Sequence, residues 1–339
     1  MTLIIHAPNV HQGGGRALLV PLLEAAARSP CIAILDSRLA RSETLPPDLT
    51  VIRVSPTLVG RLRGEWRLKK LAKAGDMVLC FGNLPPLFQI SGHVRVFLQN
   101  RYLFGRRDFA SFGLRAHLRL LVERYWLYFR LKNTIQVYVQ TPAVARELEA
   151  ETGVRARVLP FLPVVTPLEP RCAFTRFDFI YVATGEPHKN HRNLVEAWKL
   201  LAKDGLHPSL CLTLDQDKDR QLLDWVEVQV HADCLRIENV GLRSRADIDQ
   251  HYLESGALIY PSTLESFGLP LLEGAAAELP ILASELDYVR DVCVPVQTFD
   301  PGSPVSIARA VKRHLGLKES PPQPLSPAAF LQAIQVTGR

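Results

Sequence analysis

The chain of 339 residues has no long uninterrupted apolar run, although hydrophobic residues make up 47% of it. A stretch of about 18 apolar residues is the usual sign of a membrane-spanning helix, so we predict that none is present. The opening residues, Met1–His6, carry neither the basic region nor the cleavage pattern of a secretory signal. These absences favour a cytoplasmic location.

Metal-ligand patterns are also missing among the cysteines. The six cysteines occur singly, and none has the paired spacing of a zinc site. Several lie in apolar runs, which is typical of buried free thiols in a reducing compartment such as the cytoplasm. Because no other cluster of metal ligands stands out, we predict a protein that works without a metal or other cofactor.

Dinucleotide and P-loop motifs are absent as well. A glycine run, Gly13–Gly15, follows an expected strand over residues 3–7 and precedes an expected helix over residues 17–28, but its spacing matches neither motif. The N–H groups of such a loop can hold a phosphate or approach a sugar closely. Taken alone, three glycines more often form only a flexible turn.

Charge divides the chain into two unlike halves. Residues 1–165 contain 23 Lys and Arg against 11 Asp and Glu, whereas the remainder contains 17 against 23. A basic half can bind nucleic acid, anionic lipid or an anionic acceptor. No nucleic-acid-binding motif is present, so we expect no nucleic-acid partner and rank lipid and acceptor above it.

The order of the expected elements indicates the fold class. Strands and helices alternate along the chain, which predicts an α/β protein with mostly parallel sheets covered by helices on both faces. The length suits two domains. We place an N-terminal Rossmann-like domain at residues 1–165, a second at 170–310 and a C-terminal tail at 311–339, with the proline-rich stretch 160–170 as the linker.

The most informative stretch is residues 257–285. It predicts a buried strand over 257–260, a loop containing Glu265, and a helix over 271–277 that carries Glu273. Both carboxylates can face the crevice at the carboxyl end of the sheet, where open α/β sheets bind ligands. Free N–H groups at residues 267–269 and the helix dipole suit an anionic phosphate. The alternative is a plain loop charge and a solvated helix face.

A second candidate site precedes the helix expected over residues 193–203. Thr184, Gly185, Pro187, Lys189 and Asn190 form a turn after the strand expected over 177–183. A lysine at a helix start adds its charge to the helix dipole and is a suitable clamp for a diphosphate. Lys189 as an ordinary surface charge is the alternative.

These residues together resemble a known enzyme family. Pro261-Ser262, Glu265, the Phe-Gly-Leu-Pro run 267–270 and Glu273 resemble the signature of the retaining nucleotide-sugar glycosyltransferases of family 4. The resemblance implies the GT-B arrangement, two Rossmann-like doubly wound domains facing across a cleft. It also implies that the tail crosses back to the first domain, through a helix near residues 327–334.

The same resemblance assigns roles to residues. Glu265 would contact the donor sugar, Glu273 the ribose, and Lys189 would stabilise the leaving diphosphate, so Glu265 and Lys189 are the catalytic candidates. The family often has an arginine a few residues before the lysine; Thr184 or Gly185 stands there in this chain, so one phosphate contact is either missing or supplied by Arg16. The implied donor-binding set is Gly14, Gly15, Arg16, Lys189, Asn190, Glu265, Phe267, Gly268, Leu269 and Glu273.

The chain departs from the family in one loop. After the strand expected over 94–98, many members place a histidine near the reacting sugar carbon, but here Gln99, Asn100 and Arg101 follow the strand. In the usual front-face picture of retaining transfer the departing phosphate takes the acceptor proton, so no base is required there. We take these three residues as acceptor-side candidates; closing a turn is an equal alternative for Asn100.

Residues 101–132 are rich in basic and aromatic side chains. The stretch contains eight Lys and Arg and only two acidic residues, with eight aromatic residues interleaved. Such a helix can lie on an anionic membrane, or it can pack on the core while its arginines extend to water. Both interpretations stay open at this point.

We therefore expect a metal-independent, retaining hexosyltransferase. It would move a sugar from a nucleotide diphosphate donor (GDP- or UDP-linked) to a bacterial-type surface polysaccharide, lipopolysaccharide or lipid-linked glycan. A nucleotide-sugar epimerase of the same fold and a non-catalytic glycan-binding or accessory subunit are the alternatives.

Overall fold

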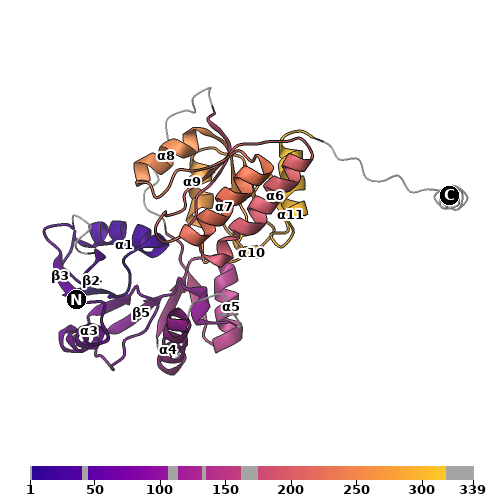
Figure 1. Ribbon diagram of the computed structural model, residues 1–339. Helices are drawn as coiled ribbons and strands as arrows, with labels where there is room; N and C mark the ends of the chain where they lie inside the picture. Colours follow the sequence, from indigo (N-terminus) through magenta and orange to yellow (C-terminus); the bar gives the residue numbers. More distant parts are fainter. Residues whose placement is uncertain (1, 40–44, 106–113, 132–134, 162–174, 318–339) are drawn as a thin grey trace, which may run out of the picture.

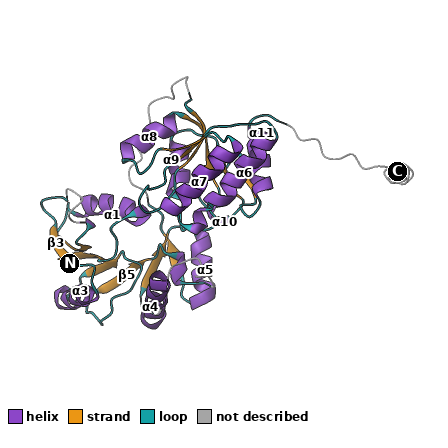
Figure 2. Cartoon of the chain, in the orientation of Figure 1, coloured by secondary structure: helices purple, strands orange, loops and turns teal. Residues whose placement is uncertain are grey.

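The computed structural model describes residues 2–39, 45–105, 114–131, 135–161 and 175–317. The protein has two lobes, one from each half of the chain (Figure 1). Each lobe is built on a parallel sheet, and helices surround both sheets (Figure 2). The expected α/β class with two doubly wound sheets is therefore confirmed.

The first lobe contains a seven-stranded sheet in the order β3-β2-β1-β4-β5-β6-β7, with every pair parallel. The order reverses at β1 and β4, and such a switch point opens a crevice at the carboxyl ends of the strands. The strands are β1 (Leu3–Ala7), β2 (Cys31–Asp36), β3 (Thr50–Val54), β4 (Met77–Cys80), β5 (His93–Phe97), β6 (Gln136–Val139) and β7 (Ala156–Val158).

The described helices of this lobe are α1 (Gly13–Ala26), α3 (Leu58–Leu71), the short η1 (Arg101–Leu103), α4 (Leu114–Arg130) and α5 (Pro142–Thr152). Helix α5 begins after Thr141, whose hydroxyl accepts a hydrogen bond from the Val144 N–H, and Pro142 takes the first helical position. The predicted glycine loop is wrong in one respect. Gln12 is the last extended residue, so Gly13–Gly15 form the first turn of α1.

The second lobe contains a six-stranded parallel sheet in the order β10-β9-β8-β11-β12-β13. Its strands are β8 (Phe177–Tyr181), β9 (Leu210–Leu212), β10 (Ile237–Asn239), β11 (Ser255–Tyr260), β12 (Ile281–Ser284) and β13 (Gln297–Phe299). Its helical segments are η2 (Pro187–Lys189), α6 (His191–Lys203), α7 (Arg220–Asp233), α8 (Arg245–Leu253), α9 (Leu269–Ala276), α10 (Asp287–Arg290) and α11 (Pro304–His314).

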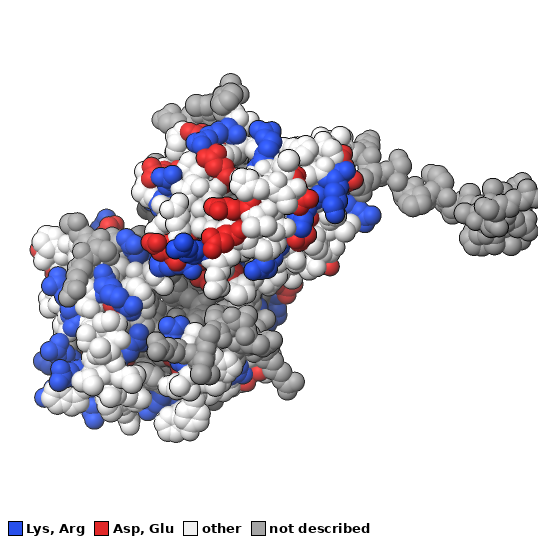
Figure 3. Space-filling view, in the orientation of Figure 1, with Lys and Arg blue, Asp and Glu red and all other residues white. Residues whose placement is uncertain are grey.

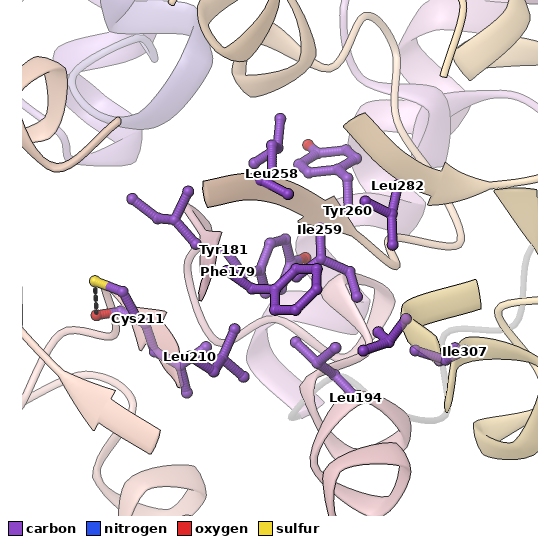
Figure 4. Packing of buried hydrophobic residues seen from close by; sticks show 14 of the residues in the cluster. Phe179, Tyr181, Leu194, Leu210, Cys211, Leu258, Ile259, Tyr260, Leu282 and Ile307 are labelled. Carbon is purple, nitrogen blue, oxygen red and sulfur yellow. Dashed lines mark hydrogen bonds between the residues drawn. The ribbon is translucent and has the colours of Figure 1, made fainter. Parts of the chain in front are cut away.

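The core of the second lobe anchors the two loops that matter most below. Phe179 and Tyr181 on β8 pack beside Ile259 and Tyr260 on β11, all fully buried (Figure 4). The rings of Tyr181 and Tyr260 meet edge to face with centroids 5.6 Å apart, a favourable aromatic geometry. The loops that follow these two strands therefore begin at tightly packed, buried strand ends.

Several predictions about the rest of the chain have a mixed outcome. Cys31, Cys80 and Cys211 are free and buried as expected, whereas Cys234 is exposed and Cys172 lies outside the described residues. Most of the predicted linker and the expected tail helix also lie outside them, so the domain boundaries stay a prediction. Among the helices that are described, none is both long and apolar enough to cross a bilayer.

Candidate functional site

A cavity of about 600 Å³ lies between the lobes, at the carboxyl ends of the strands of both sheets. Its lining from the first lobe comes from the segments after β1, β4, β5 and β6. Its lining from the second lobe comes from the segments after β8, β9, β10 and β11. The junction of the lobes runs close by, where α5 meets α10 (Figure 1).

Lys189 and Glu265 meet in this cavity, although 76 residues separate them. The Lys189 ammonium donates a 2.6 Å hydrogen bond to Glu265 Oε1, and the Tyr260 hydroxyl donates another at 2.8 Å to the same oxygen. Tyr181 holds the lysine from behind, because its hydroxyl donates to the Lys189 carbonyl at 2.7 Å. Both charged side chains are largely buried, with 17% and 12% of their surface exposed.

The Glu265 carboxyl is kept ionised by these partners. Burial by itself raises the pKa of Glu265, but the charge of Lys189 and the hydrogen bonds from Lys189 and Tyr260 outweigh it and lower the pKa below its ordinary value. His188 lines the cavity next to the pair. Burial and the Lys189 charge lower the pKa of His188, so its imidazole is neutral at pH 7. The centre is thus a buried ion pair beside a neutral imidazole.

Glu273 lines the same cavity from the first turns of α9. Its carboxylate forms an ion pair with Arg245 at the start of α8, and it accepts a 2.9 Å hydrogen bond from the Tyr252 hydroxyl. Arg245 is also 3.0 Å from Asp249. The structure therefore brings Glu273 into the cavity with Glu265 and Lys189, but holds it by a separate set of partners.

The start of α9 supplies N–H groups at the cavity wall. Gly268 adopts a left-handed conformation with φ 79°, which favours glycine, and it turns the chain from the Glu265 loop into the helix. Within the described residues the N–H groups of 267–269 donate no hydrogen bond to the protein. Such groups at a helix N-terminus suit an anion.

The glycine run of the first lobe faces this helix across the cavity. Gly14 lies so close to α9 that an added Cβ would be 3.7 Å from the Leu269 side chain. An added Cβ on Gly15 would be 3.2 Å from Val10 and 3.9 Å from the Gln99 amide oxygen. Gly14 and Gly15 therefore lie at the cavity, as predicted, with Gln99 behind them.

Two predicted donor residues are not placed with the others. Asn190 points away, because its amide donates to the carbonyls of Pro261 and Pro301 at 3.0 Å and 2.7 Å and so ties loops together. Arg16 is exposed on α1 and is not among the residues that line the cavity. Asn190 resembles the family motif in sequence, but the protein uses it as a structural link.

Arg101 also differs from its predicted acceptor-side role. Its guanidinium donates to Glu147 Oε2 through Nε at 2.9 Å and Nη2 at 2.6 Å, and to the Glu265 carbonyl at 2.7 Å through Nη1. The guanidinium is therefore engaged as a bridge between the lobes. Gln99 and Asn100, in contrast, keep their side chains in the cavity lining.

Sequence reasoning missed several residues of the site. Tyr260, Tyr252 and Arg245 hold the two glutamates, and Gln140 and Asn83 line the first-lobe wall. Tyr260 and Gln140 stand at or directly after the carboxyl end of a strand, and that position was the available signal. Arg245 and Tyr252 carry no such signal, because only the fold brings α8 to α9.

Three Asp-x-Asp triplets occur in the chain, at 215–217, 217–219 and 247–249, and could suggest a metal site. At 215–217, the Asp215 carboxylate accepts hydrogen bonds from the N–H groups of Asp217 and Lys218. At 247–249, Asp247 caps helix α8 together with Ser244. No group of three or more His, Cys, Asp and Glu side chains in the described part of the chain is arranged to hold a metal.

Curated proteins are similar to part of the chain. A serotype-specific mannosyltransferase, WbdA of Escherichia coli, is 30% identical over 152 residues, which is 44% of this chain. The matched region is only 18% of that relative's length.

Solved structures share the whole fold. HepE of Anabaena, crystallised with UDP and glucose, has a TM-score of 0.65 at 14% identity and covers 93% of this chain and 90% of its own. WaaG, a glycosyltransferase involved in lipopolysaccharide biosynthesis, has a TM-score of 0.66 with the same identity and coverage. These likenesses establish the GT-B architecture.

The sequence profile of one family matches the lobe that carries Lys189, Glu265 and Glu273. The match covers residues 173–324 and thus includes all three side chains and the turns that position them. The second lobe of this protein is thus similar to the glycosyl transferases group 1.

Proposed function

We propose that the protein is a retaining glycosyltransferase of family 4 that uses a nucleotide diphosphate sugar as donor. The observation that carries the proposal is the Lys189–Glu265 contact at 2.6 Å beside Glu273, in a cavity between two Rossmann-like lobes. These three residues come from separate turns of the chain and match the family signature. UDP in the HepE structure and the mannosyltransferase activity named for WbdA support a UDP- or GDP-linked hexose.

The proposed chemistry assigns one task to each part of the second lobe. Lys189 and the N–H groups of residues 267–269 stabilise the negative charge that grows on the leaving diphosphate. Glu265 orients the sugar and Glu273 the ribose. The bond from the sugar carbon to the phosphate oxygen breaks, a bond to the acceptor oxygen forms, and the acceptor proton passes to the departing phosphate. Positive charge comes from Lys189 and the amides, so we propose that no metal is required.

We further propose that the acceptor is a surface polysaccharide, lipopolysaccharide or lipid-linked glycan, in keeping with the serotype-specific activity of WbdA and the involvement of WaaG in lipopolysaccharide biosynthesis. The protein would then work in the cytoplasm at the inner face of the membrane. Two neighbouring helices of the first lobe support a membrane contact. Helix α4 exposes an apolar stripe that includes Leu118, Val122, Tyr125 and Phe129.

Helix α3 adds a second stripe, with Leu58, Leu62 and Trp66 exposed. Leu68 of α3 belongs to the same buried cluster as Leu120 and Leu127 of α4, so the two helices pack on one core. Basic side chains are dispersed over the first lobe (Figure 3). Apolar stripes flanked by basic residues suit an anionic membrane surface.

The donor is tested by measuring thermal unfolding with UDP, GDP, ADP and dTDP and with their hexose derivatives. A ligand at 100 times its dissociation constant adds about 2.7 kcal/mol of stability, which is a clear shift in melting temperature. One nucleotide should stand out, and the shift should persist in EDTA. No shift with any nucleotide would reject the donor site, and a shift abolished by EDTA would reject metal independence.

Catalytic roles are tested with Lys189→Ala and Glu273→Ala, with Lys203→Ala as the matched control. Lys203 is exposed at the end of α6, outside the cavity lining. We expect each cavity variant to lose at least about tenfold in transfer rate while it stays folded, with a lower melting temperature because the partner of the removed charge is left unpaired. Unchanged turnover in both would reject the site.

Release of an altered nucleotide sugar without an acceptor would identify an epimerase. Donor binding without any turnover would identify an accessory subunit.

A further inference from the structure

The two walls of the cavity differ sharply in charge. The second-lobe wall includes Lys189, Arg243, Glu265 and Glu273. Among the described residues of the first-lobe wall, Arg101 is the single charged side chain, and its guanidinium is already bound to Glu147 and to the Glu265 carbonyl. The other polar side chains of that wall are the amides of Asn9, Gln12, Asn83, Gln99, Asn100 and Gln140 and the Tyr102 phenol.

Gln99 and Gln140 form the centre of this amide wall. Phe97 on β5 is in register with Tyr138 on β6, and both glutamines stand two residues further on, so they are neighbours at the carboxyl edge of the sheet. Gln140 is only 4% exposed. Gln99 Nε2 and Gln140 Oε1 are both buried, and neither forms a hydrogen bond within the described residues. Buried amide atoms of this kind are normally satisfied by a partner.

Two asparagine side chains hold the backbone of this wall in place. The Asn83 amide oxygen accepts hydrogen bonds from the N–H groups of Gln99 at 2.5 Å and Asn100 at 2.8 Å. Asn9 donates to the Gly82 carbonyl at 2.8 Å, and an added Cβ on Gly82 would lie 1.9 Å from the Asn9 amide oxygen. Both amides are thus fixed by the backbone of the neighbouring strand end, which reduces the entropy lost when a ligand binds.

We propose that this wall binds the acceptor as an uncharged sugar, with Gln99 and Gln140 as the residues that determine acceptor specificity. A sugar hydroxyl both donates and accepts one hydrogen bond or more. It can accept from the Gln99 amide nitrogen and donate to the Gln140 amide oxygen, which satisfies both buried atoms. A phosphate or carboxylate would meet the Gln140 oxygen without a cation to pair with, because Arg101 is engaged elsewhere. The inference rests on the proposed transferase function and narrows its acceptor class.

The test compares octyl α-mannoside and octyl β-glucoside with octyl β-glucuronide and a mannoside 6-phosphate as acceptors. The enzyme is the full chain, supplied with the donor whose nucleotide gives the largest thermal shift. The variants are Gln140→Leu and Gln99→Leu, and the matched control is Gln221→Leu, because Gln221 is exposed on α7 and outside the cavity lining. Nucleotide affinity is measured on every preparation, which also shows that each variant is folded.

We expect transfer to the neutral glycosides at least about tenfold more efficient than to the anionic ones. Gln140→Leu and Gln99→Leu should raise KM for the neutral acceptor by about tenfold or more while the nucleotide Kd stays unchanged. Equal or better transfer to the anionic glycosides, transfer to none of the four, or an unchanged KM in both variants overturns the acceptor assignment and leaves the donor site standing. A wild-type protein that binds no nucleotide overturns the proposed function instead.

Discussion

At the scale of single residues, the site depends on charges that are buried only because each has a partner. An isolated carboxylate at the position of Glu265 would be costly to bury, but Lys189 and Tyr260 both bind its Oε1. Glu273 has the same kind of support from Arg245 and Tyr252. Because the partners differ, the two glutamates can be changed independently without removing each other's support.

The buried histidine two residues after Lys189 gives a prediction about how stability depends on pH. His191, the first residue of α6, is 2% exposed, and neither ring nitrogen forms a hydrogen bond within the described residues. Burial, followed by the charge of Lys189, lowers the pKa of His191 to about 3. The unfolded chain therefore binds a proton between about pH 6.5 and 3 that the folded protein does not bind, so stability is lost as the pH falls through this range.

We expect His191→Leu to reduce this loss. Between pH 7 and pH 5 the free energy of unfolding should fall by about 2 kcal/mol more in the wild type than in the variant, because the folded wild type does not bind the proton that its unfolded chain binds. The melting temperature at the two pH values measures the effect. His314→Leu is the control, since its pKa is lowered less. An equal loss in the wild type and in His191→Leu would show that His191 is not kept neutral by the fold.

At the scale of secondary-structure elements, helix α4 has one face packed on the core and another face exposed. Leu120 and Leu127 are buried in the core of the first lobe, whereas Tyr125 and Phe129 are 75% and 67% exposed. Their rings lie parallel, with centroids 6.3 Å apart. The helix therefore packs on the core through one face and presents an aromatic stripe on another, and the membrane contact stays a proposal.

The exposed face of α4 predicts binding to anionic vesicles. Replacing Tyr125 and Phe129 together with serine should weaken binding to phosphatidylglycerol-containing vesicles by at least about tenfold, because burying each ring contributes about 1.5–3 kcal/mol. Co-sedimentation with the vesicles measures it. Val228→Ser on α7 is the matched control, since Val228 is 62% exposed in the other lobe. Binding that is unchanged by the double substitution, or equal on purely phosphatidylcholine vesicles, would contradict the membrane contact.

At the scale of the whole molecule, a small number of polar contacts join the lobes beside the cavity. Arg101 donates to the Glu265 carbonyl, the Thr141 hydroxyl to the Ser266 carbonyl and the Ala143 N–H to Asp291. The Tyr102 and His188 rings also meet edge to face, with centroids 5.7 Å apart. The loop that carries Glu265 is therefore held by the first lobe, so the position of one lobe bears on the geometry of the other.

Arg101 is thus a positioning residue, and its removal should lower turnover while nucleotide binding changes little. We expect Arg101→Ala to lower kcat by about tenfold, because a charge-assisted hydrogen bond to the Glu265 loop is lost. The nucleotide Kd should change little, since the proposed nucleotide contacts lie within the second lobe. Arg155→Ala, which removes an exposed ion pair with Glu149, should leave both unchanged. A loss of nucleotide affinity as large as the loss of kcat would contradict this role.

The sequence by itself determined the features that depend on neighbours along the chain. The strand, loop and helix around Glu265 and Glu273, the Thr141 and Ser244 caps and the family resemblance all follow from residues within a few positions of one another. Boundaries moved where tertiary packing competes with local preference, as at the start of α1. The short elements α10 and β13 were not predicted, because their patterns span too few residues to show a period.

Only the tertiary structure decided which side chains meet. Lys189 reaches Glu265 across 76 residues, and Arg101 reaches the Glu265 carbonyl across 164. Parallel sheets collect the ends of strands that are distant in sequence, and this is why Gln140 stands beside Gln99 while Asn190 turns away to bind Pro301. Local chemistry supplied the candidate residues, and the order of the strands selected the ones that share a cavity.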